Sequence, residues 1–210
     1  MKESPILFST DMVKAILEGR KTQTRRINSL EGVNENPVNW LVKVINGFAF
    51  FYNSNTDKNL DIKCPYGQTG DLLWVREKFE TETDGTVKFF AGNNEVEHNT
   101  AYRQLTKWRP SIHMPKAAAR IWLQITNVCI ERLQDISDKD AIAEGIEKHP
   151  NDKTNVHYRN YHHEDFLMIT PKFSFKTLWE KTTGFDSWDA NPWVWVITYK
   201  VLSTNGKPQL

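Results

Sequence analysis

The chain has 210 residues, of which 39% are hydrophobic and 25% are charged. A chain of this length can bury about 70% of its unfolded surface in one core, so a single domain over residues 1–210 is the simplest expectation. The formal net charge is +1, which excludes a strong overall field that would attract nucleic acid. Any basic binding surface must therefore be local.

Cys64 and Cys129 form no CxxC motif and no framework of pairs, which is typical of a reducing cytoplasm. The N-terminal residues lack the apolar core of a signal peptide. No apolar run approaches the roughly 20 residues of a transmembrane helix. We therefore expect a cytoplasmic protein without membrane contact.

The chain begins with an expected strand at residues 6–8, followed by an amphipathic helix over residues 11–18. Ser9 or Thr10 can cap the start of this helix, and Gly19 can end it in a left-handed conformation. The basic residues after Gly19 therefore leave the helix in a fixed direction.

Strands dominate the rest of the chain, whereas residues 28–37 and 53–59 are polar and predict loops. A short helix is expected over residues 138–144, and another opens at Thr170-Pro171. Strands are expected at residues 38–45, 48–52, 72–79, 86–90, 119–133 and 193–201. The last of these is apolar on both faces and should be central. The pattern predicts a mixed α+β fold, a small β-barrel with short helices over its ends and long loops.

The turn after the first helix places a lysine and a threonine three residues apart, Lys21 and Thr24. A threonine hydroxyl becomes a nucleophile only when a neighbouring base takes its proton. The Lys21 amine can be that base if burial or nearby positive charge lowers its pKa, and Arg20, Arg25 and Arg26 supply such charge. The alternative is a solvated lysine beside an ordinary turn hydroxyl.

Glu144 lies in the last turn of an expected helix, where the helix dipole disfavours an anion. Partial burial there would raise its pKa and make it a candidate general acid toward a leaving amine. The alternative is an exposed glutamate at a helix end.

A second basic cluster consists of Arg109, His113, Lys116 and Arg120, with Trp108 beside it. Together with the three arginines of the first turn, it could line a groove for a nucleic-acid backbone, with Trp108 as a stacking platform. The alternative is scattered surface charge that is neutralised by the 26 acidic residues.

The histidines His157, His162 and His163 lie near Glu164 and Asp165 in a polar segment. Their spacing matches no zinc pattern, and no cysteine is close. We therefore expect loop histidines, no metal ligands and no cofactor.

The run from Gly19 to Arg26, Gly-Arg-Lys-Thr-x-Thr-x-Arg, resembles the signature of the ASCH domain family, which has a PUA-like β-barrel fold. Residues 70–76, 125–144 and 194–200 are similar, in the same order, to later units of that family. The resemblance covers about half of the chain.

The Cys-Pro-Tyr-Gly and Trp-Arg-Pro-Ser-Ile-His-Met-Pro motifs, at residues 64–67 and 108–115, are similar to those of ASCH-like proteins of phages and prophages. Relative to small ASCH proteins, residues 28–66, 79–118 and 147–170 resemble insertions around the barrel. Such insertions could widen the pocket or close it.

The resemblance implies hydrolysis of the acetyl amide of N4-acetylcytidine, the activity of small bacterial members. By position in the motif, Lys21 would activate Thr24, Thr24 would attack the acyl carbon, and Glu144 would protonate the exocyclic nitrogen. Arg26 would anchor the substrate. Further substrate contacts are expected from Arg20, Arg25, Trp108 and Arg109.

The expected partner is thus a modified nucleoside or RNA, and amide hydrolysis is the most concrete expected activity. A non-catalytic RNA- or DNA-binding module is the alternative from a different class. A metal-dependent ribonuclease that uses the histidine-rich segment is a weaker third hypothesis.

Overall fold

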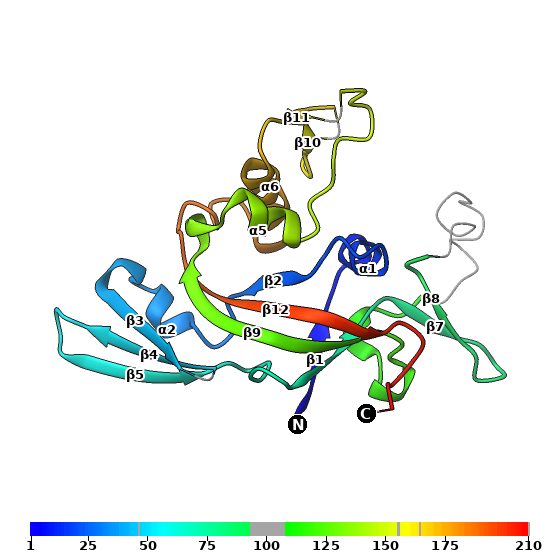
Figure 1. The fold of residues 1–210 in the computed structure, drawn as a ribbon, viewed down its shortest axis with the longest axis horizontal. Helices are drawn as coiled ribbons and strands as arrows, with labels where there is room; N and C mark the ends of the chain where they lie inside the picture. Colours follow the sequence, from blue (N-terminus) through cyan, green and yellow to red (C-terminus); the bar gives the residue numbers. More distant parts are fainter. Residues whose placement is uncertain (46, 93–107, 155, 164, 210) are drawn as a thin grey trace.

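The computed structural model describes residues 1–45, 47–92, 108–154, 156–163 and 165–209. Its centre is a five-stranded sheet in the order β1-β6-β9-β12-β2 (Figure 1). The strands are β1 (Glu3–Leu7), β6 (Leu72–Arg76), β9 (Trp122–Arg132), β12 (Trp193–Ser203) and β2 (Gln23–Arg26). The β1–β6 pair is parallel and the other pairs are antiparallel. The sheet is open, with β1 and β2 as its edges, so the described residues contain no closed barrel.

The sheet has a separate core on each face of β12, which explains why this strand is apolar throughout. Trp195, Ile197 and Tyr199 pack in a cluster that includes residues of the first helix. Val194 and Val196 pack in a second cluster under the last two helices. The prediction that this strand is central is confirmed, because β12 lies between β9 and β2.

The three predicted helices are confirmed. Each begins at a local capping signal, which is why it could be predicted. They are α1 (Thr10–Leu17), α5 (Asp138–Ala143) and α6 (Pro171–Thr183), with Ser9, Ser137 and Thr170 as N-caps. A further short helix, α2 (Glu31–Asn34), lies in the segment predicted to be a loop. That prediction was wrong because Leu30 and Val33 are fully buried and anchor the turn to the core.

The described parts of the three segments that resemble insertions lie outside the five-stranded sheet (Figure 1). The first contains a sheet of β3 (Trp40–Ile45), β4 (Phe48–Asn53) and β5 (Lys58–Lys63). The others contain the pairs β7 (Phe79–Thr81) with β8 (Val87–Phe89) and β10 (Tyr158–Arg159) with β11 (Leu167–Met168). Short 3₁₀ helices lie at Pro37–Asn39, Ser111–His113, Lys116–Ala118 and Leu133–Asp135. Residues 93–107 of the second segment are outside the described residues.

In the part of the chain that the structure describes, every helix is too short or too polar to cross a lipid bilayer.

Gly145 follows the C-cap residue of α5 and packs closely against Ala15 of α1. Its φ is +93°, and a Cβ at this position would lie 2.8 Å from the Cβ of Ala15 and 3.0 Å from the Cβ of Lys21. We expect Gly145→Ala to lower the free energy of unfolding by about 3 kcal/mol, through both backbone strain and overpacking. Urea unfolding of the purified chain measures this loss.

Gly19→Ala is the matched control, because Gly19 also has a positive φ, +73°, but nothing lies within 4 Å of the position that its Cβ would take. It should cost only about 1 kcal/mol. Equal losses in the two variants would show that the close packing of α1 against the end of α5 contributes nothing.

Candidate functional site

The candidate site lies at the free edge of the sheet, where the start of β2 meets the end of α5. The backbone N–H of Thr22 donates to the carbonyl of Ala143 at 2.8 Å, and Lys21 and Glu144 form an isolated antiparallel bridge. These contacts join residues that are more than a hundred positions apart in the chain. The structure thus brings together the expected amine and the expected carboxyl group.

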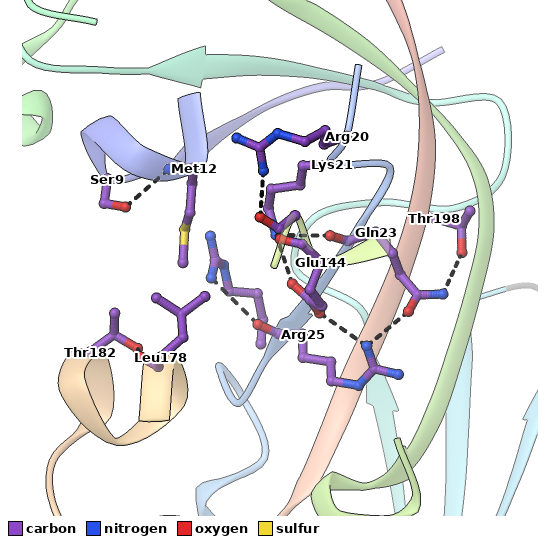
Figure 2. Close-up of polar contacts among 12 residues, drawn as sticks. Ser9, Met12, Arg20, Lys21, Gln23, Arg25, Glu144, Leu178, Thr182 and Thr198 are labelled. Atoms are coloured by element: carbon purple, nitrogen blue, oxygen red, sulfur yellow. Dashed lines mark hydrogen bonds and ion pairs between the residues drawn. The ribbon is translucent and has the colours of Figure 1, made fainter. Parts of the chain in front are cut away.

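Lys21 is fully buried and donates three hydrogen bonds (Figure 2). Its Nζ is 2.7 Å from Oε2 of Glu144, 2.8 Å from the carbonyl of Glu144 and 2.9 Å from the carbonyl of Gln23. Three acceptors match the three N–H groups of an ammonium. Burial lowers the pKa of Lys21, the negative charge of Glu144 opposes this, and Arg26 and Arg25 lower the pKa further. The alternative of a solvated lysine is therefore wrong.

Arg25 holds the other oxygen of the same carboxylate. Its Nη1 donates to Oε1 of Glu144 at 3.1 Å and to Oε1 of Gln23 at 2.8 Å. Its Nε and Nη2 donate to Oε1 of Glu131 at 2.8 and 2.6 Å. Burial raises the pKa of Glu131, although Arg25 opposes the shift. Glu144, only 4% exposed, thus lies between two buried cations, and the alternative of an exposed helix-end glutamate is wrong.

Thr24 is fully buried, and its Oγ1 has no hydrogen-bond partner among the described residues. The expected hydrogen bond between Thr24 and Lys21 is therefore not formed in this structure. Side chains alternate along a strand, so Thr24 and Arg26 lie on one face of β2 and Arg25 lies on the other. The Arg26 guanidinium is 5.1 Å from the centroid of the Phe8 ring, and its Nη2 donates to the Leu7 carbonyl at 2.8 Å.

A pocket of about 170 Å³ opens beside Glu144, between α1 and α6. Its walls combine apolar side chains with a few polar groups, as small-molecule sites do. The volume is below the roughly 300 Å³ at which sites for drug-sized ligands begin, so it suits a single ring or a small acyl amide. The lining residues are Met12, Arg25, Arg26, Ile27, Asn28, Glu144, Phe175, Leu178, Trp179, Thr182 and Thr183. Lys21 and Thr24 are not among the residues that line it.

The structure does not bring three other expected substrate contacts to this pocket. Arg20 turns away, because its Nη1 donates to the Gly145 carbonyl at 2.7 Å. Trp108 lines a separate recess with Phe8. Its ring packs edge-on against the ring of Phe90, with 5.2 Å between the ring centroids. Arg109 lies in a third recess, whose other residues include two glutamates and an aspartate.

Two further residues of the second basic cluster are engaged elsewhere. Lys116 contacts Glu3 at 2.5 Å, and Arg120 donates to both oxygens of Glu77 at 3.0 and 2.8 Å. These ion pairs support the alternative of separate, neutralised charges over one continuous basic groove.

The histidine-rich segment forms individual contacts. His157 Nδ1 is 3.0 Å from a carboxylate oxygen of Asp152, and His162 stacks on Phe185 at 4.8 Å. Glu164 lies outside the described residues. Among the residues that are described, no three His, Cys, Asp or Glu side chains are arranged to hold a metal ion.

Sequence reasoning missed several members of the site. Met12 and the residues of α6 join the pocket only through tertiary packing, which no local pattern reveals. Glu131 did give a signal, since it is a charged residue near the end of a mainly apolar strand. Such a residue is seldom buried without a partner, and Arg25 is that partner.

Compared with known proteins, the chain matches no family model, no curated protein and no solved structure. The resemblance to the ASCH family therefore depends on the sequence motifs alone. What the site can do must follow from its residues and their geometry.

Proposed function

We propose that this chain is a PUA-like ASCH protein that hydrolyses the acyl amide on the exocyclic amine of a modified cytidine, such as N4-acetylcytidine. One observation carries the proposal, the buried Lys21–Glu144 pair, whose glutamate lines a small pocket. Burying two charges costs several kcal/mol per ion, and a well-packed apolar pair would do as well for stability. A buried lysine with a lowered pKa, in contact with a side chain that lines a cleft, is typical of a catalytic site.

The 2.7 Å contact between Lys21 Nζ and Glu144 Oε2 offers a path for the proton that the reaction needs. In the proposed reaction, Lys21 first passes a proton to Glu144, and the neutral amine then takes the hydroxyl proton as Thr24 Oγ attacks the acyl carbon. Glu144 gives its proton to the exocyclic nitrogen, the C–N bond breaks, and cytidine leaves. The lowered pKa of Lys21 favours the first transfer.

The second half of the reaction returns every group to its starting state. Water attacks the acyl-Thr24 ester and gives a proton to Glu144. The Thr24 oxygen takes a proton from Lys21 as acetic acid leaves, and Glu144 then returns its proton to Lys21. One amide and one water thus give one cytidine and one acetic acid, which ionises to acetate.

In the proposed reaction the acyl group must reach Thr24 from the pocket, so a side chain of the pocket wall has to move, and Met12 is suited to this. It lines the pocket and also packs against the core cluster that contains Phe8. Figure 2 shows it extending from α1 toward Leu178 of α6. Methionine is unbranched and flexible, so we propose that its rotation admits the acyl group to Thr24.

Two polar side chains at the rim suit the substrate. Arg26 makes two hydrogen bonds to backbone carbonyls, which leaves further N–H groups of its guanidinium for a carbonyl of the pyrimidine. Asn28 also lines the pocket, and its amide N–H groups can donate, while its Oδ1 accepts a hydrogen bond from the Tyr66 hydroxyl at 2.9 Å. The ring of Trp179 supplies an apolar wall.

Turnover of N4-acetylcytidine by the purified full chain, with EDTA present, tests the proposal. We expect equal amounts of cytidine and acetate, and the same rate in Lys200→Ala, a control at an exposed position on β12. The absence of product at high enzyme concentration would overturn the proposal for this nucleoside. RNA cleavage that EDTA abolishes would favour a metal-dependent ribonuclease instead.

The recess of about 530 Å³ that contains Trp108 favours one other function, a non-catalytic RNA-binding module. Lys78 lines the same recess and supplies a positive charge beside the aromatic side chain. Stacking together with a cation is how single-stranded RNA is held. Tight RNA binding with a steep salt dependence, without turnover of the nucleoside, would support this alternative.

A further inference from the structure

Tyr199 has a buried hydroxyl for which the described residues provide no partner. The residue is 3% exposed, and its Oη makes no hydrogen bond. Thr24 Oγ1 and Trp195 Nε1 share this condition. Buried polar groups are nearly always hydrogen-bonded, so three unbonded groups on neighbouring strands require an explanation.

The strand register places these groups on one face of the β2–β12 pair. Ile197 lies opposite Thr24, and the Tyr199 N–H donates to the carbonyl of Thr22 at 3.0 Å. Since alternate residues share a face, the side chains of Tyr199 and Thr24 project to the same side. Trp195 lies opposite Arg26, farther along the strand from Lys21.

Phe8 links Tyr199 to the catalytic groups. Its ring centroid is 6.4 Å from that of Tyr199, and 5.6 Å from Nζ of Lys21. The Arg26 guanidinium lies against the same ring at 5.1 Å. Tyr199 therefore belongs to the same neighbourhood as the Lys21–Glu144 pair.

The pairing of β12 with β9 is irregular beside this residue. Thr198 lies opposite Asn127 and Tyr199 lies opposite Ile125, so the extra residue of the bulge, Thr126, is on β9 and the alternation along β12 is kept. Bulges are over-represented beside active sites. Burial raises the pKa of Tyr199 well above its usual value, and the charge of Glu144 adds to the shift, so the hydroxyl remains protonated and can donate.

We propose that Tyr199 is a catalytic hydrogen-bond donor, whose hydroxyl binds the acyl oxygen of the substrate as Thr24 attacks the acyl carbon. This inference rests on the proposed function. In the tetrahedral intermediate the acyl oxygen carries a negative charge, and a donor already in position stabilises that charge. The substrate then supplies the partner that the folded chain does not.

Tyr199→Phe tests the inference, because it removes the hydroxyl and keeps the ring. We expect kcat on N4-acetylcytidine to fall by about 10²–10³, with KM changed less than about threefold, as when one donor to a developing oxyanion is lost. The urea midpoint of unfolding should stay the same or rise, because no hydrogen bond within the protein is lost.

Tyr161→Phe is the matched control. Tyr161 is also buried, but its hydroxyl accepts a hydrogen bond from the Glu147 N–H at 3.3 Å, and the residue lies in the other core cluster. Removing the Tyr161 hydroxyl should leave kcat unchanged.

The outcomes separate the two proposals. An inactive wild-type chain would overturn the proposed function and this inference together. An active wild-type chain with an equally active Tyr199→Phe variant would overturn the inference alone. A change confined to KM, or a lower unfolding midpoint, would also overturn it, because either would assign the hydroxyl to ground-state binding or to the fold.

Discussion

Replacing Lys21 with methionine should lower the free energy of unfolding by about 3–5 kcal/mol and abolish turnover. The reason is that the Glu144 carboxyl group would stay buried without the Lys21 ammonium, and among the described residues Arg25 would remain its hydrogen-bond donor at 3.1 Å. Removing one partner of a buried ion pair costs far more than removing both. Urea unfolding and acetate release measure the two effects.

The double variant Lys21→Met with Glu144→Gln separates folding from chemistry. It removes both charges, so it should regain at least half of the lost stability and still show no turnover. Lys176→Met is the surface control, because Lys176 is 33% exposed and lies 3.7 Å from Glu180, a contact worth less than about 1 kcal/mol. A single Lys21 variant as stable as the wild type would refute the buried ion pair.

Replacing Thr24 with valine should reduce kcat at least about a thousandfold and leave stability within about 0.5 kcal/mol. Valine has the shape of threonine, and the hydroxyl that it removes has no partner among the described residues. Mass spectrometry of the chain mixed with substrate should show an added acetyl group on the wild type and none on the variant.

Thr24→Ser is the matched control, since it keeps the hydroxyl and should retain measurable turnover. Full activity in Thr24→Val would contradict the proposal that Thr24 is the nucleophile. The reaction would then require Glu144 to activate a water molecule instead. Loss of activity in Thr24→Val together with a large loss of stability would contradict the claim that the Thr24 hydroxyl makes no hydrogen bond in the folded protein.

Local signals made the helices predictable from the sequence. Ser9, Ser137 and Thr170 each accept a hydrogen bond from the first turn of their helix, and Gly19 and Gly184 end two of these helices. Such caps depend only on residues that are a few positions apart, so one sequence is enough to find them.

The conformation of the basic run was not predictable in the same way. Residues 23–26 are polar and predict a turn, yet they form β2, because β12 pairs with them. A strand separates neighbouring side chains, so Arg25 contacts Glu144 while Arg26 lies against Phe8. The sequence alone shows two adjacent, similar arginines, and only the strand pairing assigns them different partners.

That Lys21 and Glu144 belong to one site was expected from the family resemblance and not from any local pattern, whereas their direct ion pair was not expected. The pocket wall from α6 could not be expected at all, because it depends on how that helix packs. The described residues do not form the predicted closed barrel, since the sheet order ends at β1 on one side and at β2 on the other.

The exposed border of a sheet is a template for association with other chains, and β2 forms one border here. At its start, the Thr22 N–H is bound by Ala143 and the Gln23 carbonyl by Lys21, so both groups are already occupied within the molecule. The Lys21 amine, which is proposed to take part in the reaction, therefore also keeps this backbone group from pairing with another chain. Lys21→Met should free the Gln23 carbonyl and raise the tendency of the protein to form fibrils.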